Sequence, residues 1–181
     1  MNKSKIRNKI IKLRKNNTNK NFKISLEKFF SFLKTSKLNS KNLGGYYPSN
    51  FEIDDLEILE LLEKKDYKIS LPIIKKDNQM DFFKWSNNDP LKINKYGIPE
   101  PISSKIFYPD ILLVPLVGYD NRLNRLGYGG GFYDRYIEKI EKIKKVIKIG
   151  LAFSCQKLNS VPINQHDKKL DYIVTEKEIL K

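Results

Sequence analysis

The sequence lacks the marks of a secreted, membrane-spanning or zinc-binding chain. Its 181 residues include one cysteine, Cys155, and one histidine, His166. A single cysteine excludes an internal disulfide, no zinc-binding spacing surrounds it, and nothing in the sequence places His166 beside it as the partner of a catalytic thiol. No apolar run approaches the roughly 18 residues that span a bilayer, and no signal-peptide core follows the basic stretch Met1–Lys15. We therefore expect a cytoplasmic protein with no membrane partner.

Acidic residues are in short supply as well. The chain has 35 Lys and Arg against 21 Asp and Glu, which gives a formal net charge of +14. Such a charge raises the alternative of a basic nucleic-acid-binding module. However, Lys, Asn and Ile are abundant along the whole chain, and basic residues alternate with acids, as in Glu138–Lys142, in the manner of a solvated helix face. We expect no nucleic-acid partner and a single globular domain over residues 1–181.

The hydrophobic pattern predicts helices alternating with strands. The run Ile111–Val114 is continuously apolar and closed by Pro115, which fits a strand buried on both faces. Ser25 is a candidate N-cap for the second helix. Alternation of this kind indicates an α/β fold with a largely parallel sheet, whose ligands bind outside the carboxyl ends of the strands. Helices are expected over residues 4–15, 25–38, 54–65 and 131–144, and strands over 43–47, 68–71, 80–84, 111–114, 146–153 and 172–174.

The segment Arg122–Arg135, RLNRLGYGGGFYDR, carries the clearest chemical signal. It lies between a predicted buried strand and a predicted helix. Its glycines allow close backbone approach to a ligand, and the start of the helix suits a phosphate. Arg122 and Arg125 can add charge-assisted hydrogen bonds, and Asp134 in the first helical turn can hold Mg²⁺. The segment is neither a P-loop nor a dinucleotide fingerprint. The residues alone predict a phosphate site, with a glycine turn needed only for packing as the alternative.

Several motifs, in order along the chain, resemble those of one known family. Arg125–Asp134, RLGYGGGFYD, is similar to the signature R-L-G-x-G-x-G-Y-Y-D of the 5-formyltetrahydrofolate cyclo-ligases. Phe132 stands where the family usually has tyrosine, and Leu123 stands where many members have glycine. Further segments that resemble the family are Lys3–Arg7, Phe51–Asp54, Tyr96–Pro101 (YGIPEP), Asp110–Pro115 (DILLVP) and His166–Glu176 (HDKKLDYIVTE).

The resemblance implies a three-layer α/β/α fold, ATP and Mg²⁺ as cofactors, and a reduced folate as substrate. Lys3 and Arg7 would contact the ATP phosphates, and Asp134 and Asp171 would bind the metal. Arg125 and Tyr133 would be catalytic. The nucleotide loop that follows Arg125 would consist of Gly127, Tyr128, Gly129, Gly130, Gly131, Phe132, Tyr133 and Asp134.

On the folate side, Glu52 would contact the pterin and Tyr47 would lie beside it. Trp85 is open between stacking on the folate and packing against the core. His166 and Asp167 are expected to organise their loop. The implied reaction is ATP-dependent closure of 5-formyltetrahydrofolate to 5,10-methenyltetrahydrofolate by a monomer, with no protein nucleophile. The alternative is a different ATP-dependent phosphotransferase with a related sheet. A folate-binding test would distinguish it from a cyclo-ligase.

Overall fold

A seven-stranded sheet forms the centre of the fold in the computed structural model, which describes residues 2–17, 23–36, 38 and 40–181. The five inner strands run parallel, and the two edge strands, β11 and β3, run antiparallel to their neighbours. The predicted α/β class with a largely parallel sheet is therefore confirmed. In spatial order the strands are β11 (Ile179–Leu180), β10 (Tyr172–Val174), β9 (Ile147–Leu151), β6 (Ile111–Pro115), β1 (Asn42–Gly44), β2 (Lys68–Ile74) and β3 (Met80–Lys84).

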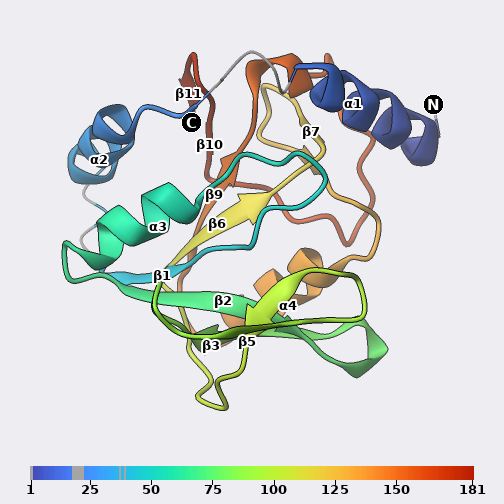
Figure 1. Cartoon of the computed structure of the whole chain (residues 1–181). Coiled ribbons are helices and arrows are strands. Elements are labelled where there is room, and N and C mark those ends of the chain that lie inside the picture. Colours follow the sequence, from blue (N-terminus) through green and yellow to red (C-terminus); the bar gives the residue numbers. More distant parts are fainter. Residues whose placement is uncertain (1, 18–22, 37, 39) are drawn as a thin grey trace.

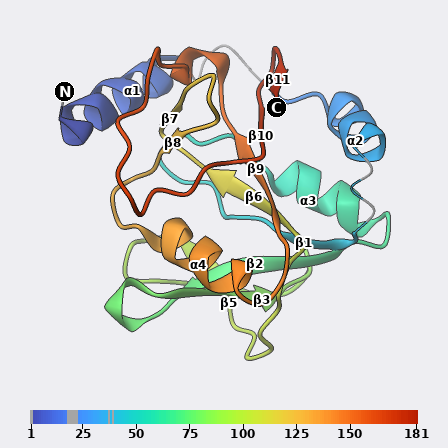
Figure 2. The ribbon, with the colours of Figure 1, turned by 180° about the vertical axis from the view of Figure 1, so that it is seen from behind.

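Helices cover both faces of this sheet. Residues of β6 alternate between two cores: Ile111 and Leu113 pack with α2 (Leu26–Thr35) and α3 (Leu56–Glu63), whereas Leu112 and Val114 pack with α4 (Phe132–Glu141). This alternation is the consequence of a strand buried on both faces. Figure 1 shows α2 and α3 on one side, and Figure 2 shows α4 from the other. The three-layer arrangement is thus observed.

The first helix, α1 (Lys3–Asn17), lies at the end of the sheet rather than on a face (Figure 1). Its residues Ile6 and Ile10 form a third apolar cluster with Val117, Leu126 and Val161. None of the helices in the described residues is long and apolar enough to cross a membrane.

Two short ladders flank the sheet. One pairs β4 (Leu91–Ile93) with β5 (Pro99–Pro101), and the other pairs β7 (Gly118–Tyr119) with β8 (Arg125–Leu126). The second ladder folds the chain back after β6, because the N–H of Val117 donates to the carbonyl of Leu126 at 2.8 Å. This ladder places Arg125 at the carboxyl end of the sheet.

Some element boundaries differ from those expected. The first strand stops at Gly44 instead of reaching Tyr47, because the N–H of Tyr46 donates to the carboxyl of Asp55 at 3.0 Å and not to a strand. Strand β2 continues through Pro72 to Ile74: β1 pairs with it only as far as Ser70, so the missing N–H of proline breaks no bond on that side.

The second helix begins as predicted but ends earlier. The side chain of Ser25 accepts from the N–H of Lys28, which confirms the N-cap, and the helix ends at Thr35 rather than residue 38. Lys37, which the predicted helix included, lies outside the described residues, as does Met1 of the basic N-terminal stretch.

The sheet has a topological switch point at its middle. From β1 the chain passes through α3 to β2, and from β6 it passes through α4 to β9, on the opposite side. Connections that leave neighbouring parallel strands in opposite directions open a crevice at their carboxyl ends. The functional site is therefore expected beyond Gly44 and Pro115.

Candidate active site

A cavity of about 960 Å³ lies at this switch point. Its walls come from the segment after β1, the glycine-rich loop before α4, the first turns of α1, the β4–β5 hairpin and the loop 164–167. This volume is at the upper end of the range for small-molecule sites. The predicted site residues that line it are Lys3, Arg7, Tyr47, Glu52, Arg125, Gly127, Tyr128, Gly129, Gly130, Gly131, Phe132, Tyr133 and Asp134.

The glycine-rich loop depends on glycine at two positions. Gly129 and Gly131 have φ of +105° and +67°, values that side chains rarely adopt. A Cβ at Gly129 would also lie 3.2 Å from Cζ of Arg7, whose Nε donates to the carbonyl of Gly127 at 2.7 Å. Gly131 is the N-cap residue of α4. The loop is therefore fitted closely against α1 on one side and feeds directly into α4 on the other.

The turn before this loop carries a backbone conformation that glycine usually supplies. Leu123, at the position where many cyclo-ligases have glycine, has φ of +65°. The buried Asp120 stabilises the turn, since its carboxylate accepts from the N–H groups of Arg122, Asn124 and Val161. In this chain the turn between Asp120 and Arg125 therefore has a leucine in the left-handed region, stabilised by the Asp120 carboxylate.

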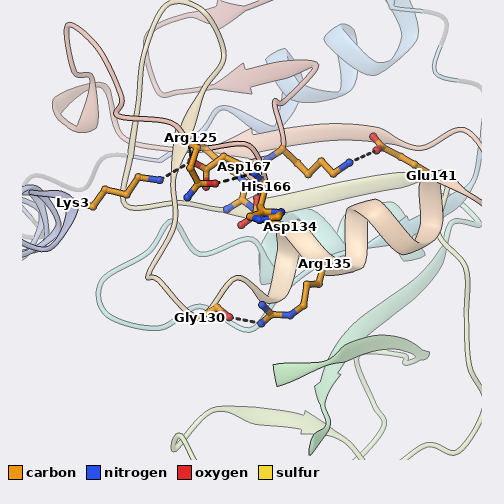
Figure 3. A network of polar contacts seen from close by, with 10 residues as sticks. Lys3, Arg125, Gly130, Asp134, Arg135, Glu141, His166 and Asp167 are labelled. Atoms are coloured by element: carbon orange, nitrogen blue, oxygen red, sulfur yellow. Dashed lines mark hydrogen bonds and ion pairs between the residues drawn. The ribbon is translucent and has the colours of Figure 1, made fainter. Parts of the chain in front are cut away.

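Arg125 and Asp134 form an ion pair at the wall of the cavity (Figure 3). Nη2 of Arg125 lies 2.6 Å from Oδ1 of Asp134, and the same oxygen accepts from the N–H of Lys168 at 3.0 Å. Arg125 is 7% exposed, so the pair is largely desolvated. Its position places a fixed positive charge beside the first turn of α4.

Asp134 is the one predicted metal ligand that faces the cavity. Its Oδ2 has no hydrogen-bond partner among the described residues. No group of three or more acidic, His or Cys side chains in the described residues could hold a metal ion. Mg²⁺ commonly binds through one or two carboxylates together with substrate phosphates. These residues therefore fit an ion that arrives with a nucleotide, rather than a preformed metal site.

Lys3 is held at the rim of the cavity by Asp167. Its Nζ lies 2.6 Å from Oδ2 of Asp167, which also accepts from the N–H of Asn164 at 2.7 Å (Figure 3). Asp167 thus orders its own loop, and it ties that loop to α1. His166 lines the cavity next to it.

Glu52 forms the opposite wall, where its side chain is half-buried. Burial raises the pKa of its carboxyl group, although Tyr128 and a hydrogen bond from the N–H of Ser49, at 2.7 Å, act in the other direction. Behind it, Asp55 is fully buried, and burial raises the pKa of its carboxyl well above the ordinary range. The buried hydroxyl of Tyr133 has no hydrogen-bond partner in the described part of the chain. Of these polar groups, Glu52 is therefore the one that is held at the cavity wall by a short hydrogen bond.

Two predicted site residues lie elsewhere. Trp85 is 5% exposed and packs in the core shared with α2 and α3, so the core-packing alternative holds and the folate contact is not supported. Asp171 precedes β10, at the amino end of the strands. Its carboxylate accepts from the N–H of Lys148 at 2.7 Å and pairs with the Lys148 ammonium.

Lys148 also pairs with Glu141. Figure 3 shows Glu141 in the last turn of α4 and Asp134 in the first turn. Asp134 and Asp171 therefore lie at opposite ends of the helix, and the structure does not bring them together as a metal pair. The expectation that they would share an ion is corrected accordingly.

Two residues of the site escaped the sequence analysis. Arg14 is buried behind the glycine-rich loop, and its spacing was a usable signal, because it continues the buried i, i+4 stripe of Ile6 and Ile10. Tyr96, inside the YGIPEP motif, lines the cavity with its ring 6.0 Å from that of Phe132, edge to face. The motif had been identified, but no role was assigned to it.

Comparison with known proteins points to one family. A model described as the 5-formyltetrahydrofolate cyclo-ligase family matches residues 1–176. The 5-formyltetrahydrofolate cyclo-ligase of Haemophilus influenzae is 33% identical over 138 residues, which are 72% of this chain and 73% of that one. The protein of the same name from Escherichia coli is 29% identical over 135 residues, covering 71% and 74%.

Solved structures agree. The NMR structure of the 5,10-methenyltetrahydrofolate synthetase of Aquifex aeolicus superimposes with a TM-score of 0.80 at 29% identity, covering 100% of this chain and 93% of that one. A 5,10-methenyltetrahydrofolate synthetase from Mycoplasma pneumoniae gives 0.72 at 25% identity, covering 98% and 100%.

Proposed function

This chain belongs to the 5-formyltetrahydrofolate cyclo-ligase family, and on that premise we propose that it converts 5-formyltetrahydrofolate to 5,10-methenyltetrahydrofolate with turnover of ATP to ADP and phosphate. The observation that carries the proposal is the cavity at the switch point, which joins a basic, glycine-lined wall to a wall that contains the half-buried carboxyl group of Glu52. One side suits a polyphosphate and the other suits a flat heterocycle.

The nucleotide half is formed by α1, the glycine-rich loop and the start of α4. Lys3, Arg7 and Arg125 all line the cavity, and each is fixed by a contact with Asp167, Gly127 or Asp134. Side chains fixed in this way need little reordering when they bind the oxygens of a phosphate chain. Mg²⁺, held by Asp134 and the nucleotide, would supply further neutralisation of phosphoryl charge.

The folate half is formed around Glu52 and Tyr47. A pterin presents an edge of N–H donors, and a carboxylate accepts two such bonds at once. Because burial makes ionisation of Glu52 costly, a ligand that donates to it replaces the hydrogen bonds lost to water. Tyr96 adds an aromatic ring to the lining of the cavity, beside Phe132.

The chemistry requires activation of an amide-like oxygen. Transfer of the γ-phosphoryl group to the formyl oxygen forms a new O–P bond and releases ADP. The N10 amine then attacks the formyl carbon and loses its proton, the C–O bond breaks, and phosphate leaves. Arg125 would neutralise charge on the transferred group, and the buried, unpaired hydroxyl of Tyr133 would donate to a reacting oxygen. These two residues are our catalytic candidates.

The direct test is formation of methenyltetrahydrofolate by the purified protein, with ATP consumption followed in parallel. We expect one ATP per product, and little product when ATP or Mg²⁺ is left out. A folded sample that makes no product at saturating ATP and Mg²⁺ would refute the proposal. Binding of ATP without binding of folate would instead favour a different phosphotransferase. The expectations of a cytoplasmic monomer without nucleic-acid partners stay predictions.

A further inference from the structure

Arg14 is a charged side chain in a place where charge is costly. It is 1% exposed, although it sits on a helix whose other basic residues face solvent or the cavity. Its guanidinium donates to the carbonyl of Leu116 at 3.2 Å, to the carbonyl of Asn50, and to the hydroxyl of Tyr128 at 2.5 Å. No carboxylate of the described residues pairs with it directly. Buried arginines without a carboxylate partner are uncommon, because desolvation of the charge is then poorly compensated.

The three acceptors belong to the two sides of the crevice. Leu116 directly follows β6, and Asn50 lies in the loop that follows β1, two residues before Glu52. Tyr128 belongs to the glycine-rich loop. The Asn50 turn is a strained one, since Asn50 and Phe51 have φ of +47° and +61°. One guanidinium therefore holds together the loops that supply the folate wall and the nucleotide wall.

The hydroxyl of Tyr128 connects Arg14 to Glu52. Arginine has no acceptor, so Tyr128 must accept from Arg14, and its single proton is left for another partner. The candidate for that partner is Glu52, because the Tyr128 hydroxyl is near enough to its carboxyl group to lower the pKa of that group. In this series of contacts the donors run from Arg14 to Tyr128 to Glu52, so Glu52 accepts a hydrogen bond and donates none.

We infer that Arg14 is a positioning residue for folate binding: through Tyr128 and the Asn50 turn it holds the Glu52 carboxyl group in place at the cavity. The inference rests on the proposed function, because it assigns to Glu52 a folate contact. The charge of Arg14 also lowers the pKa of Glu52, against the effect of burial.

Several titratable or charged groups lie near Glu52 and bear on its pH dependence. They are Tyr46 after β1, Asp55 before α3, Tyr128 in the glycine-rich loop, Tyr133 in α4 and Arg14 in α1. Burial raises the pKa of Tyr46 and Tyr133 well above its usual value, so both stay neutral at working pH. Asp55 is the one other group that can titrate in the acid range, and an Asp55→Asn background removes it.

The test compares Arg14→Gln with Lys12→Gln, which removes a charge from an exposed position of the same helix. We expect Arg14→Gln to raise KM for 5-formyltetrahydrofolate about tenfold, the usual effect of losing one charge-assisted contact, and KM for ATP less than about threefold. Arg14→Lys should recover part of the loss. Loss of the positive charge raises the pKa of Glu52. On acidification, folate binding by Arg14→Gln should therefore begin to weaken at a higher pH than folate binding by the wild type. The same difference should be seen in the Asp55→Asn background.

Tyr128→Phe supplies an independent arm if Arg14→Gln folds poorly. It removes the connecting hydroxyl from a half-exposed side chain, and we expect the same upward shift of the acid limit of folate binding. In the double variant the two losses should not add, because both changes interrupt one chain. Equal losses for ATP and folate, additive losses, or an unmoved acid limit would overturn the inference. A wild-type protein that binds no folate would overturn the proposed function, and the inference with it.

Discussion

At the scale of single residues, the carboxyl groups in and near the site differ in their partners and in their burial. Asp134 is paired with Arg125, Asp167 with Lys3, Glu52 is reached by Arg14 through Tyr128, and Asp55 forms no ion pair within the described part of the chain. Burial without a charged partner favours the protonated acid. Asp55, which lies behind the cavity, therefore differs from the carboxyl groups that line it.

Asp55 gives a prediction about stability and pH. Its pKa is raised in the folded protein by burial, so above about pH 4 the unfolded chain releases a proton that the folded chain retains. The unfolded state then binds fewer protons, and the free energy of unfolding falls as the pH rises toward the folded pKa. Asn resembles the protonated acid and escapes this loss. We expect Asp55→Asn to be more stable than the wild type at pH 7 and to lose that advantage near pH 4.

Denaturant unfolding at both pH values measures the difference. Asp54→Asn is the matched control, because Asp54 is the exposed neighbour of Asp55. Asp54 accepts from the N–H of Leu56 through Oδ1, and an asparagine there has the same oxygen. Equal behaviour of the two variants across the pH range would show that Asp55 is ionised in the folded protein.

Single residues also mark the limit of prediction from sequence. The cavity lining from Arg125 to Asp134 was predictable, since a glycine cluster between a strand and a helix has few other uses. Asp171 was misplaced because a motif match gives order along the chain but not the edge of the sheet on which a side chain emerges. Arg14 was missed although its i, i+4 spacing from Ile6 and Ile10 places it on the buried face of the helix, because a basic residue is usually assigned to solvent whatever its spacing.

At the scale of elements, long periodic segments were predictable, and of the short strands 172–174 was predicted with its observed bounds as β10, whereas the flanking ladders were not. The run Ile111–Val114 is β6, and the helical pattern at 131–144 is α4. The ladders β4–β5 and β7–β8 and the edge strand β11 have two or three residues per strand, too few to show a period. These short pieces nevertheless shape the cavity, because they bring Tyr96 and Arg125 to it.

Helix α1 is the element whose functional role is easiest to test. Lys3 and Arg7 are tied to Asp167 and Gly127 in the cavity wall, whereas Lys9 and Lys12 are exposed. Replacing Lys3 and Arg7 together with Ala should raise KM for ATP about tenfold or more, since a contact from a cation to a phosphate contributes roughly 1.5–3 kcal/mol. Stability should change by less than about 1 kcal/mol, because ion pairs of this exposure contribute little.

The Lys9→Ala, Lys12→Ala double variant removes the same charge from the other side of α1. Steady-state kinetics with ATP varied at saturating folate distinguishes the two. If both double variants show the same KM for ATP, the effect is one of general charge, and α1 is not part of the nucleotide site.

At the scale of the whole molecule, the net charge of +14 is the excess of 35 basic over 21 acidic side chains. Several lysines form ion pairs that connect elements, such as Lys139 with Asp81, Lys144 with Asp110 and Lys148 with Glu141, and each such pair adds nothing to the net charge. Lys3, Arg7 and Arg125 serve the cavity. The excess charge therefore identifies no partner by itself, and the absence of a nucleic-acid partner stays a prediction.

The cavity is assembled from segments between Lys3 and Asp167, so a bound ligand should stabilise the fold as a whole. A ligand at a hundred times its Kd adds about 2.7 kcal/mol to the free energy of unfolding. For a chain of this length, each kcal/mol shifts the melting temperature by roughly 2–4 °C, so ATP and 5-formyltetrahydrofolate should each raise it by about 5–10 °C.

Glu52→Gln should weaken folate binding about tenfold and so remove about 1.4 kcal/mol, or half of the folate shift, while leaving the ATP shift intact. Glu57→Gln, an exposed change on α3, should leave both shifts unaltered. Scanning calorimetry at fixed ligand concentrations measures all of these, and a Glu52→Gln variant that loses both shifts equally would mean that Glu52 supports the fold of the cavity and does not contact the folate.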